Sequence, residues 1–346
     1  METIFLSLGD NVRDPVDGET LTDAQKHQRL IEQAVAVEHA GFDVIQLGEH
    51  HFNHFVFAAP EVVLAAIAQH TTRLRLGTGV TTITTLDPVL VAEGFATLDV
   101  MSGGRAEIAL GRGAYEQTFQ AMGRPQEHAT LIFEEFVELL WQLFNEEEIT
   151  WKGDWRAALD GITVRPRPVQ ESIPMWNSST SSVALSARLG LGAEWVAALA
   201  PFDSLKPYAD EFREAWARAG RAPASWRLRL GVHFHVAKTS QQARTDFEPY
   251  HSNYLRENAK LRISAYQRRW LKPDEEVDRE HIMIKPEGDI IPFCGSPAEL
   301  VDKIGRAREV LGISGVAMAI DMGGMPQHKV LNQIDLVGSE VIPALN

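Results

Sequence analysis

The stretch that decides the fold is 42-FDVIQLGEHHF-52. Its first half is a short apolar run of the kind that forms a strand buried on both faces. Its second half sets a carboxylate and two imidazoles, Glu49, His50 and His51, directly after that strand. Buried polar side chains are costly unless they are hydrogen-bonded or take part in chemistry. We therefore expect a functional site at the carboxyl end of this strand, where parallel barrels build their active sites.

The same alternation of a short apolar run and a longer amphipathic stretch continues along the chain. Helix starts lie between the runs, such as the capping box at Thr22 and the Asp87-Pro88 pair of N-cap and N1 proline. Eight strands, each followed by a helix, predict an α/β fold: one (β/α)8 TIM-barrel domain over residues 1–346. The expected strands are residues 4–8, 43–47, 74–80, 106–110, 174–178, 194–198, 227–236 and 315–320.

The chain is longer than the ~250 residues of a typical barrel, so the excess is expected in insertions. Residues 151–170 are rich in Trp, Arg, Pro and Gly and are expected to form a hairpin. Residues 239–292 are polar, charged and weakly periodic, and we expect them to form a lid over the site.

Composition excludes several classes of function. A net charge of -14 disfavours nucleic acid as a partner, because no basic stripe is available to neutralise phosphates. The one cysteine, Cys294, excludes a disulfide within the chain and a thiolate metal cluster. Neither a signal peptide nor a run of 18 apolar residues is evident, so we expect no membrane span and a cytoplasmic location.

Polar and glycine-rich groups follow several of the expected strands. They are Gly48 to His51, Thr78-Gly79, Gly111-Arg112-Gly113, Ser178 to Ser182, and Asp321 to Gly324. Because the carboxyl ends of all the strands meet at one end of a barrel, these groups are predicted to converge on one site.

The serine run precedes an apolar helical stretch, and Arg112 follows another strand. Hydroxyls and free backbone N–H groups at a helix start, together with a guanidinium, are typical of an anion site. The alternative is that one serine caps the helix and the others are solvated. A phosphate site here would also differ from the usual location after strands seven and eight of such barrels.

The histidines raise a metal hypothesis that the spacing does not favour. Adjacent residues of an extended segment point to opposite sides, so His50 and His51 are poorly placed to ligate one ion. The sequence His233-Phe234-His235 has a suitable spacing, but the pair is more readily explained by a ligand pocket or a polar layer. We predict that no metal is bound, and that His50 is a catalytic imidazole whose ordinary pKa suits proton transfer.

Together these segments resemble the bacterial luciferase-like flavin monooxygenases, over nearly the whole chain. The residues that carry the resemblance are 49–52, 76–80, 98–105, 111–113, 187–190, 323–326 and 341–345. The resemblance implies a barrel that binds reduced FMN at its carboxyl-terminal face. It also implies a flavin C4a-hydroperoxide, formed with O2, that oxygenates an organic substrate. The aromatic residues of the sequence indicate a small and apolar substrate, with the alternative that at least half of them belong to the core; they are Phe55, Phe57, Tyr115, Phe119 and Trp176.

The resemblance also assigns residues. Catalysis would fall to His50 with Glu49, and a non-proline cis peptide would lie at Gly79–Val80. The cofactor-binding residues would be Thr78, Gly79, Arg112, Gly113, Ser178, Ser179 and Ser182, with Arg112 and the serines on the FMN phosphate. The expected partners are a separate NAD(P)H:flavin reductase and a second copy of the chain, in a homodimer formed through helices near strands two and three.

Two departures from the family pattern bear on the function that the resemblance implies. Gly111 stands where light-emitting members carry a reactive cysteine, so light emission is not supported, and Ser178 stands where a carboxylate is common. Three alternatives remain open: a deazaflavin-dependent dehydrogenase or reductase on the same fold, a non-catalytic flavin-binding protein and, last, a metal-dependent hydrolase.

Overall fold

A computed structural model describes residues 1–196, 202–261 and 293–345 and contains the expected barrel. Within these residues, eight parallel strands follow one another around the barrel in chain order. The ring closes between β3 and β5 through a parallel bridge from Leu76 to Ala106. The strands are β1 (Glu2–Ser7), β2 (Val44–Leu47), β3 (Arg75–Thr78), β5 (Ile108–Gly111), β8 (Met175–Asn177), β9 (Gly192–Val196), β10 (Leu228–Val236) and β12 (Gly315–Ala319).

Two short strands extend this ring at its carboxyl end. The expected strand 74–80 divides: β3 stops at Thr78, the Gly79–Val80 peptide is cis, and β4 (Thr81–Thr82) then pairs with β5. The cis bond implied by the family resemblance is thus confirmed. In the same way β11 (Phe293–Gly295) pairs with the last three residues of β10.

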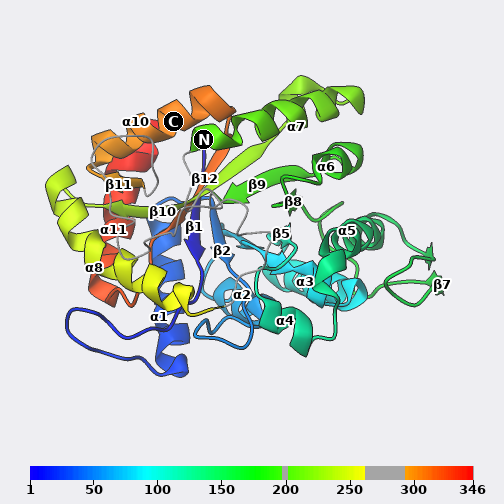
Figure 1. The fold of residues 1–346 in the computed structure, drawn as a ribbon, viewed down its shortest axis with the longest axis horizontal. Coiled ribbons are helices and arrows are strands. Elements are labelled where there is room, and N and C mark those ends of the chain that lie inside the picture. Colours follow the sequence, from blue (N-terminus) through cyan, green and yellow to red (C-terminus); the bar gives the residue numbers. More distant parts are fainter. Residues whose placement is uncertain (197–201, 262–292, 346) are drawn as a thin grey trace.

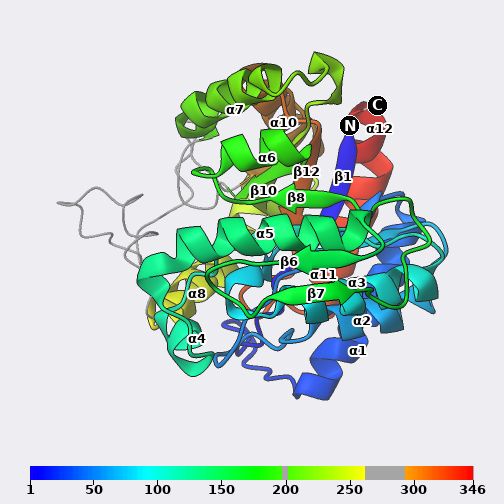
Figure 2. The same cartoon turned by 90° about the vertical axis from the view of Figure 1, so that its right-hand side faces the viewer.

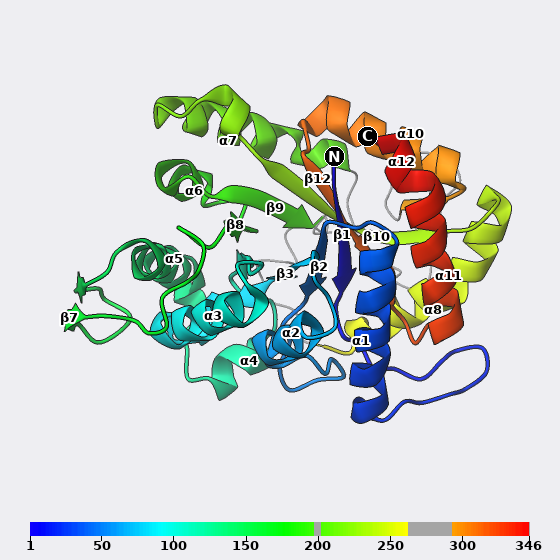
Figure 3. The ribbon, with the colours of Figure 1, turned by 180° about the vertical axis from the view of Figure 1, so that it is seen from behind.

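Helices surround the strands, as Figure 1 and the view from behind in Figure 3 show. All nine residues of β10 are buried, because one face meets the barrel interior and the other meets the helices. The helices are α1 (Asp23–His39), α2 (Pro60–Ala68), α3 (Pro88–Ser102), α4 (Glu116–Ala121), α5 (Ala129–Asn145), α6 (Val183–Leu189), α7 (Lys206–Arg218), α8 (Ser240–Ala259), α10 (Pro297–Leu311), α11 (Gln327–Leu336) and α12 (Ile342–Leu345).

Helix starts follow the signals in the sequence. Thr22 and Gln25 form both bonds of the capping box that begins α1. The Asp87 side chain accepts the N–H of Val89 at the start of α3, with Pro88 at N1. None of the helices in the described residues is long and apolar enough to cross a membrane.

The first insertion is the expected hairpin, and the second differs from expectation. β6 (Ile149–Trp151) and β7 (Leu159–Ile162) pair antiparallel beside α5, as Figure 2 shows. Residues 240–259, in contrast, form the regular helix α8, which Thr239 caps. Phe247 and Tyr250 of α8 are buried in the main core, so this segment is an ordered helix packed on the barrel, and its role as a lid stays a prediction. The rest of that prediction, residues 262–292, lies outside the described residues.

A charged layer fills the barrel near the amino-terminal ends of the strands. Arg229 of β10 is fully buried, and its guanidinium bonds Glu2 of β1 at 2.7 Å and Glu194 of β9 at 3.2 Å. It also bonds Glu107, directly before β5, and lies over the Trp176 ring of β8 at 3.5 Å from the ring centroid. Burying these charged groups costs desolvation free energy, which the ion pairs offset only when all the partners are present.

We predict that Arg229→Met lowers the free energy of unfolding by about 3–5 kcal/mol, because Glu194 would remain buried without a cation and Glu107 would keep only Arg75. Urea denaturation of both proteins measures the difference. Arg218→Met is the control, since its pair with Glu214 is exposed and should matter by less than about 0.5 kcal/mol. Equal losses in the two variants would contradict this account of the layer.

Candidate functional site

The loops that follow the strands bring two clusters to the carboxyl-terminal mouth of the barrel. One cluster surrounds His50 after β2, and the other surrounds Arg112 after β5. Between them in the ring, the Gly79–Val80 peptide lies partly exposed at the end of β3. The groups that the sequence analysis expected to converge therefore lie at the same end of the barrel, and their union in one site stays a prediction.

His50 lies against aromatic rings. Its ring stacks on Phe55 at a centroid distance of 4.0 Å and lies 5.6 Å from the ring of Tyr115. Burial, with smaller effects from His54 and His51, lowers the pKa of His50 to about 3. The imidazole is thus neutral at neutral pH, and the argument from its ordinary pKa does not hold. It can donate or accept a hydrogen bond, but it is not a cationic acid.

Glu49 points away from His50. Its carboxylate bonds His51 Nε2 at 2.8 Å and accepts the hydroxyl of Thr82, while its backbone N–H donates to the carbonyl of Val80 at 3.1 Å. The Glu49 side chain is only 3% exposed. It therefore ties the loop after β2 to the end of β3 and holds His50 in position. His50 and His51 have different neighbours, as expected for adjacent residues on an extended segment.

Thr78 and Gly79 differ in what they offer to a ligand. Thr78 is fully buried, and its hydroxyl donates to the Ala109 carbonyl at 3.3 Å and accepts from Thr81 at 2.9 Å. Its side chain does not face the mouth. A Cβ on Gly79 would lie 2.9 Å from the side-chain ends of both Leu6 and Gln46, so a larger residue there would require these side chains to shift.

The second cluster consists of Arg112, Thr130, Ser179, Ser181, Ser182 and Glu134. The Arg112 guanidinium donates to the hydroxyl of Thr130 at 3.0 Å and to that of Ser181 at 3.2 Å. The hydroxyls of Ser179 and Ser181 lie 3.2 Å apart. Gly113, which follows Arg112, has a φ of +76° and turns the chain away toward α4.

The serine loop owes its shape to Asn177 at the end of β8. The Asn177 carboxamide accepts the Ser179 N–H at 2.7 Å and donates to the Ser186 hydroxyl at 2.6 Å. Ser182 occupies the N-cap position of α6, but its hydroxyl donates to Glu134 at 2.9 Å and caps nothing. The hydroxyl of Ser178 is enclosed and has no hydrogen-bond partner among the described residues.

This cluster can hold an anion on one side only. Arg112 supplies the charge, and Ser179 and Ser181 supply hydroxyl donors beside it. Glu134 adds a negative charge next to Ser182, so a phosphate is expected nearer to Ser181. Sequence reasoning missed Thr130 and Glu134, because they lie on α5 and nothing in their local sequence indicates the contact with the serine loop.

His233 and His235 do not share a partner. His233 Nδ1 faces His251 Nε2 of α8 at 3.0 Å, whereas His235 stacks on Phe247 at a centroid distance of 5.0 Å. Among the residues that the structure describes, no group of three or more His, Cys, Asp or Glu side chains is arranged to hold a metal ion. The sequence prediction placed His233 and His235 in a ligand pocket or a polar layer, and His251 was missed.

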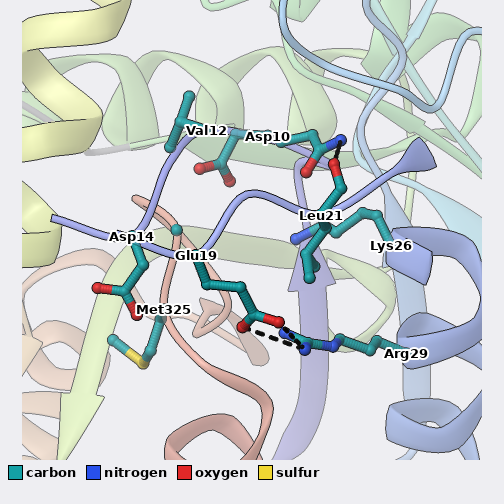
Figure 4. A pocket seen from close by; sticks show the side chains of 10 residues that line it. Asp10, Val12, Asp14, Glu19, Leu21, Lys26, Arg29 and Met325 are labelled. Atoms are coloured by element: carbon teal, nitrogen blue, oxygen red, sulfur yellow. Dashed lines mark hydrogen bonds and ion pairs between the residues drawn. The ribbon is translucent and has the colours of Figure 1, made fainter. Parts of the chain in front are cut away.

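A small polar cavity lies beside the mouth, where β1 leads into α1 (Figure 4). Lys26 bonds Asp321 at 3.2 Å, and Asp10 accepts the N–H of Gly323 at 2.7 Å. Burial, with a smaller contribution from Asp321, raises the pKa of Asp10 to about 6 against the opposing charge of Lys26. The cavity measures about 20 Å³, which is enough for one water molecule and far too small for a cofactor.

Comparison with known proteins points to one family. Residues 1–314 match the family described as luciferase-like monooxygenase. The chain is 29% identical to limonene 1,2-monooxygenase of Rhodococcus erythropolis, over 92% of this chain and 81% of that protein. It is 25% identical to the oxygenase component of the flavin-dependent trigonelline monooxygenase of Acinetobacter baylyi, over 94% and 91% of the two chains.

Solved structures share the fold. Monooxygenase RslO1 from Streptomyces bottropensis matches with a TM-score of 0.84 and 22% identity over 100% of both chains. The oxygenating constituent of 3,6-diketocamphane monooxygenase from Pseudomonas putida, in complex with FMN, matches with a TM-score of 0.77 and 19% identity over 99% and 98%. An F420-dependent secondary alcohol dehydrogenase matches with a TM-score of 0.72 and 21% identity over 100% and 99%.

The neutral state of His50 leads to a prediction about stability and pH. His50 has a pKa of about 3 in the folded protein, whereas an unfolded histidine titrates near 6.5. Above about pH 7 both states are neutral at this position, so it has no effect there. As the pH falls below that value, only the unfolded state takes up the proton, and folding loses stability.

We therefore expect His50→Gln to reduce the loss of stability in acid by up to about 1.4 kcal/mol per pH unit between about pH 6 and 4. Chemical denaturation across this range measures the slope. His70→Gln, at an exposed histidine, should keep the wild-type slope. Parallel curves for wild type and His50→Gln would show that His50 is not held neutral.

Proposed function

The chain belongs to the luciferase-like monooxygenase family, and from that premise we propose that it is an FMN-dependent monooxygenase. It is an oxidoreductase of the class that incorporates oxygen. Reduced FMN held by the residues of this mouth would supply the oxygen-activating chemistry, through the C4a-hydroperoxide that the family resemblance implies, for oxygenation of a small, apolar organic substrate. The observation that carries the proposal is the pairing of an Arg112–serine anion site with a neutral imidazole, His50, at one barrel mouth.

The residues of the mouth fit a flavin mononucleotide in three respects. Arg112, Ser179 and Ser181 offer charge and hydroxyls to a terminal phosphate. The enclosed hydroxyl of Ser178 lacks a partner among the described residues and would gain one from that phosphate. The Gly79–Val80 backbone is partly exposed at the end of β3, where it could contact the flavin ring.

His50 would act beside the flavin ring as a neutral hydrogen-bonding group. The low pKa of His50 makes it a weak base. We therefore propose that the neutral imidazole carries a proton on one of its own ring nitrogens and passes it on within the site. Glu49 would contribute indirectly, because its bonds to His51 and Thr82 fix the loop that carries His50.

The substrate is proposed to be apolar because the surroundings of His50 are aromatic. Phe55 and Tyr115 flank the imidazole. Other aromatic candidates from the sequence have different neighbours: Phe57 and Phe119 are buried in the core, and Trp176 lies under Arg229. A water-poor pocket of this kind favours a neutral organic molecule and protects a reactive intermediate.

Two partners are proposed as well. A separate NAD(P)H:flavin reductase would supply reduced FMN, which agrees with the name of the trigonelline relative as an oxygenase component. A second copy of the chain would cover α2 and α3. Phe52, Val62 and Leu90, on or near these helices, are each more than half exposed, and such apolar exposure supports an interface there.

A deazaflavin-dependent dehydrogenase is the alternative that a specific observation favours, since an F420-dependent enzyme shares the fold over the whole chain. A comparison of binding separates the two. Tight binding of FMN and weak binding of F420 supports the monooxygenase, and the reverse supports the dehydrogenase.

We expect Arg112→Met to weaken FMN binding by about 1.5–3 kcal/mol, the usual contribution of a hydrogen bond to a charged group. The affinity for riboflavin, which lacks the phosphate, should stay within about twofold of the wild-type value. Titrations followed by flavin fluorescence measure both. Arg124→Met serves as a control, because Arg124 contacts the Phe136 ring and the Trp155 carbonyl and none of the serines. An equal loss for FMN and riboflavin would argue against a phosphate contact.

The reaction itself is tested by mixing the anaerobic complex of protein and reduced FMN with O2. The wild-type protein should give a transient with hydroperoxide absorbance that outlasts reduced flavin free in air. His50→Ala should still bind FMN but lose at least about a hundredfold in the rate of oxygenation, the lower end of the range for a lost proton-transfer group. Binding without any transient would indicate a dehydrogenase or a non-catalytic flavin-binding protein.

A further inference from the structure

Besides His50, two imidazoles that face each other lie at the mouth, and they have no role in the function proposed above. His233 of β10 and His251 of α8 are 4% and 2% exposed, and their facing nitrogens, Nδ1 and Nε2, are 3.0 Å apart. Burial lowers the pKa of both histidines, that of His251 to about 4. Two neutral imidazoles at this distance share one proton, so one ring donates and the other accepts.

His233 faces the interior of the barrel. Arg229, four residues earlier on β10, reaches Glu107 and Glu194 across the interior. Residues at intervals of two along a strand share a face, so His233 is on the same side as Arg229. It pairs in register with Ala319 of β12, which in turn pairs with Leu6 of β1. This level is nearer to the carboxyl-terminal mouth than the charged layer.

Ring contacts connect His233 to His50. Tyr254 of α8 lies 5.2 Å from the His233 ring and 6.4 Å from the Phe55 ring, and Phe55 stacks on His50. The two imidazoles are therefore separated by two aromatic rings. Both border the mouth, and Tyr254 of α8 supplies the ring that joins them.

The outer nitrogens of the pair are Nε2 of His233 and Nδ1 of His251. Neither has a hydrogen-bond partner among the residues that the structure describes. The direction of the inner hydrogen bond decides what His233 Nε2 offers. If His233 donates to His251, then Nε2 is an acceptor, and if His251 donates, then Nε2 carries the proton.

We propose that His233 is a second ligand-contacting imidazole of the mouth, and that His251 is the positioning residue that fixes its tautomer. The ligand group is a hydrogen-bonding oxygen or nitrogen of a neutral ring compound. That group belongs either to the flavin ring or to the organic substrate. The proposal rests on the proposed function of the same mouth, and it adds α8 to the elements that determine what binds there.

The tautomer is tested first, without any ligand. Nitrogen-15 NMR of histidine-labelled protein at pH 8 distinguishes the two neutral tautomers, and loss of signals in His233→Gln assigns His233. We expect a single tautomer for His233 in the wild-type protein and a mixture in His251→Phe. His251→Gln, which keeps a hydrogen-bonding group of similar reach, should restore a single tautomer. His70→Gln, at an exposed site, should change nothing.

Ligand binding is tested second, with two probes. Anaerobic titration with reduced FMN reports on the flavin, and the effect of cyclohexanone on the decay of the oxygenated transient reports on a neutral substrate. We expect His233→Phe and His251→Phe to weaken the response to the same probe by up to about tenfold each, the usual effect of losing one hydrogen bond. The double variant should be no weaker than either single variant, because the two residues act as one unit. His251→Gln should lie close to the wild type.

The outcomes are distinguishable. A loss of FMN affinity assigns the contact to the flavin, and a loss confined to the ketone response assigns it to the substrate. A single His233 tautomer in His251→Phe, additive losses, or no change with either probe would overturn the proposal. If the folded wild-type protein binds no FMN, the proposed function fails, while the NMR experiment still decides whether His251 controls His233.

Discussion

The buried guanidinium of Arg229 is the interaction on which the rest of the barrel depends. Its partners come from β1, β9 and the start of β5, and its flat face lies on Trp176 of β8. Glu194 accepts in addition from Gln46 of β2, and Glu107 accepts from Arg75 of β3. One charged layer thus joins strands on all sides of the ring. Because a slip of one residue would turn these side chains out of the interior, the layer fixes the register of the strands and, with it, the positions of the loops at the mouth.

The two ends of the barrel differ in the charge state of their buried side chains. In the lower layer, although burial opposes it, the Arg229 guanidinium lowers the pKa of Glu107 and keeps that carboxylate charged. Burial raises the pKa of Glu194 in the same layer to about 7, against the opposing charge of Arg229. At the mouth, burial lowers the pKa of His50, His235 and His251 and raises that of Tyr115. These groups are therefore neutral. Arg112 brings positive charge to one side of the mouth, and this asymmetry suits a ligand with an anionic tail and a neutral ring.

Much of the fold could be predicted because parallel strands covered on both faces must be apolar runs, and all eight runs became strands. Helix α8 was missed because its exposed residues are polar and charged, while its buried positions include His251 and Asn253. The hydrogen-bond partners of these two side chains come from distant segments. His251 pairs with His233, and Asn253 donates to the carbonyls of Arg13 and Gly323. Glu134 and Lys26 illustrate the same limit: contacts between distant segments leave no local pattern in a single sequence.

Helix α8 shapes the mouth through side chains that make no contact with the Arg229 layer. Asn253 anchors it to the loops after β1 and β12, at 3.0 Å from each carbonyl. Tyr254 and Asn258 then reach the rings around His50, since Asn258 accepts the hydroxyl of Tyr115 at 3.3 Å. None of these contacts involves the Arg229 layer. The shape and hydrogen bonding of the mouth can therefore change through side chains of α8 while the strands keep their register, because the groups that hold the barrel together lie at its other end.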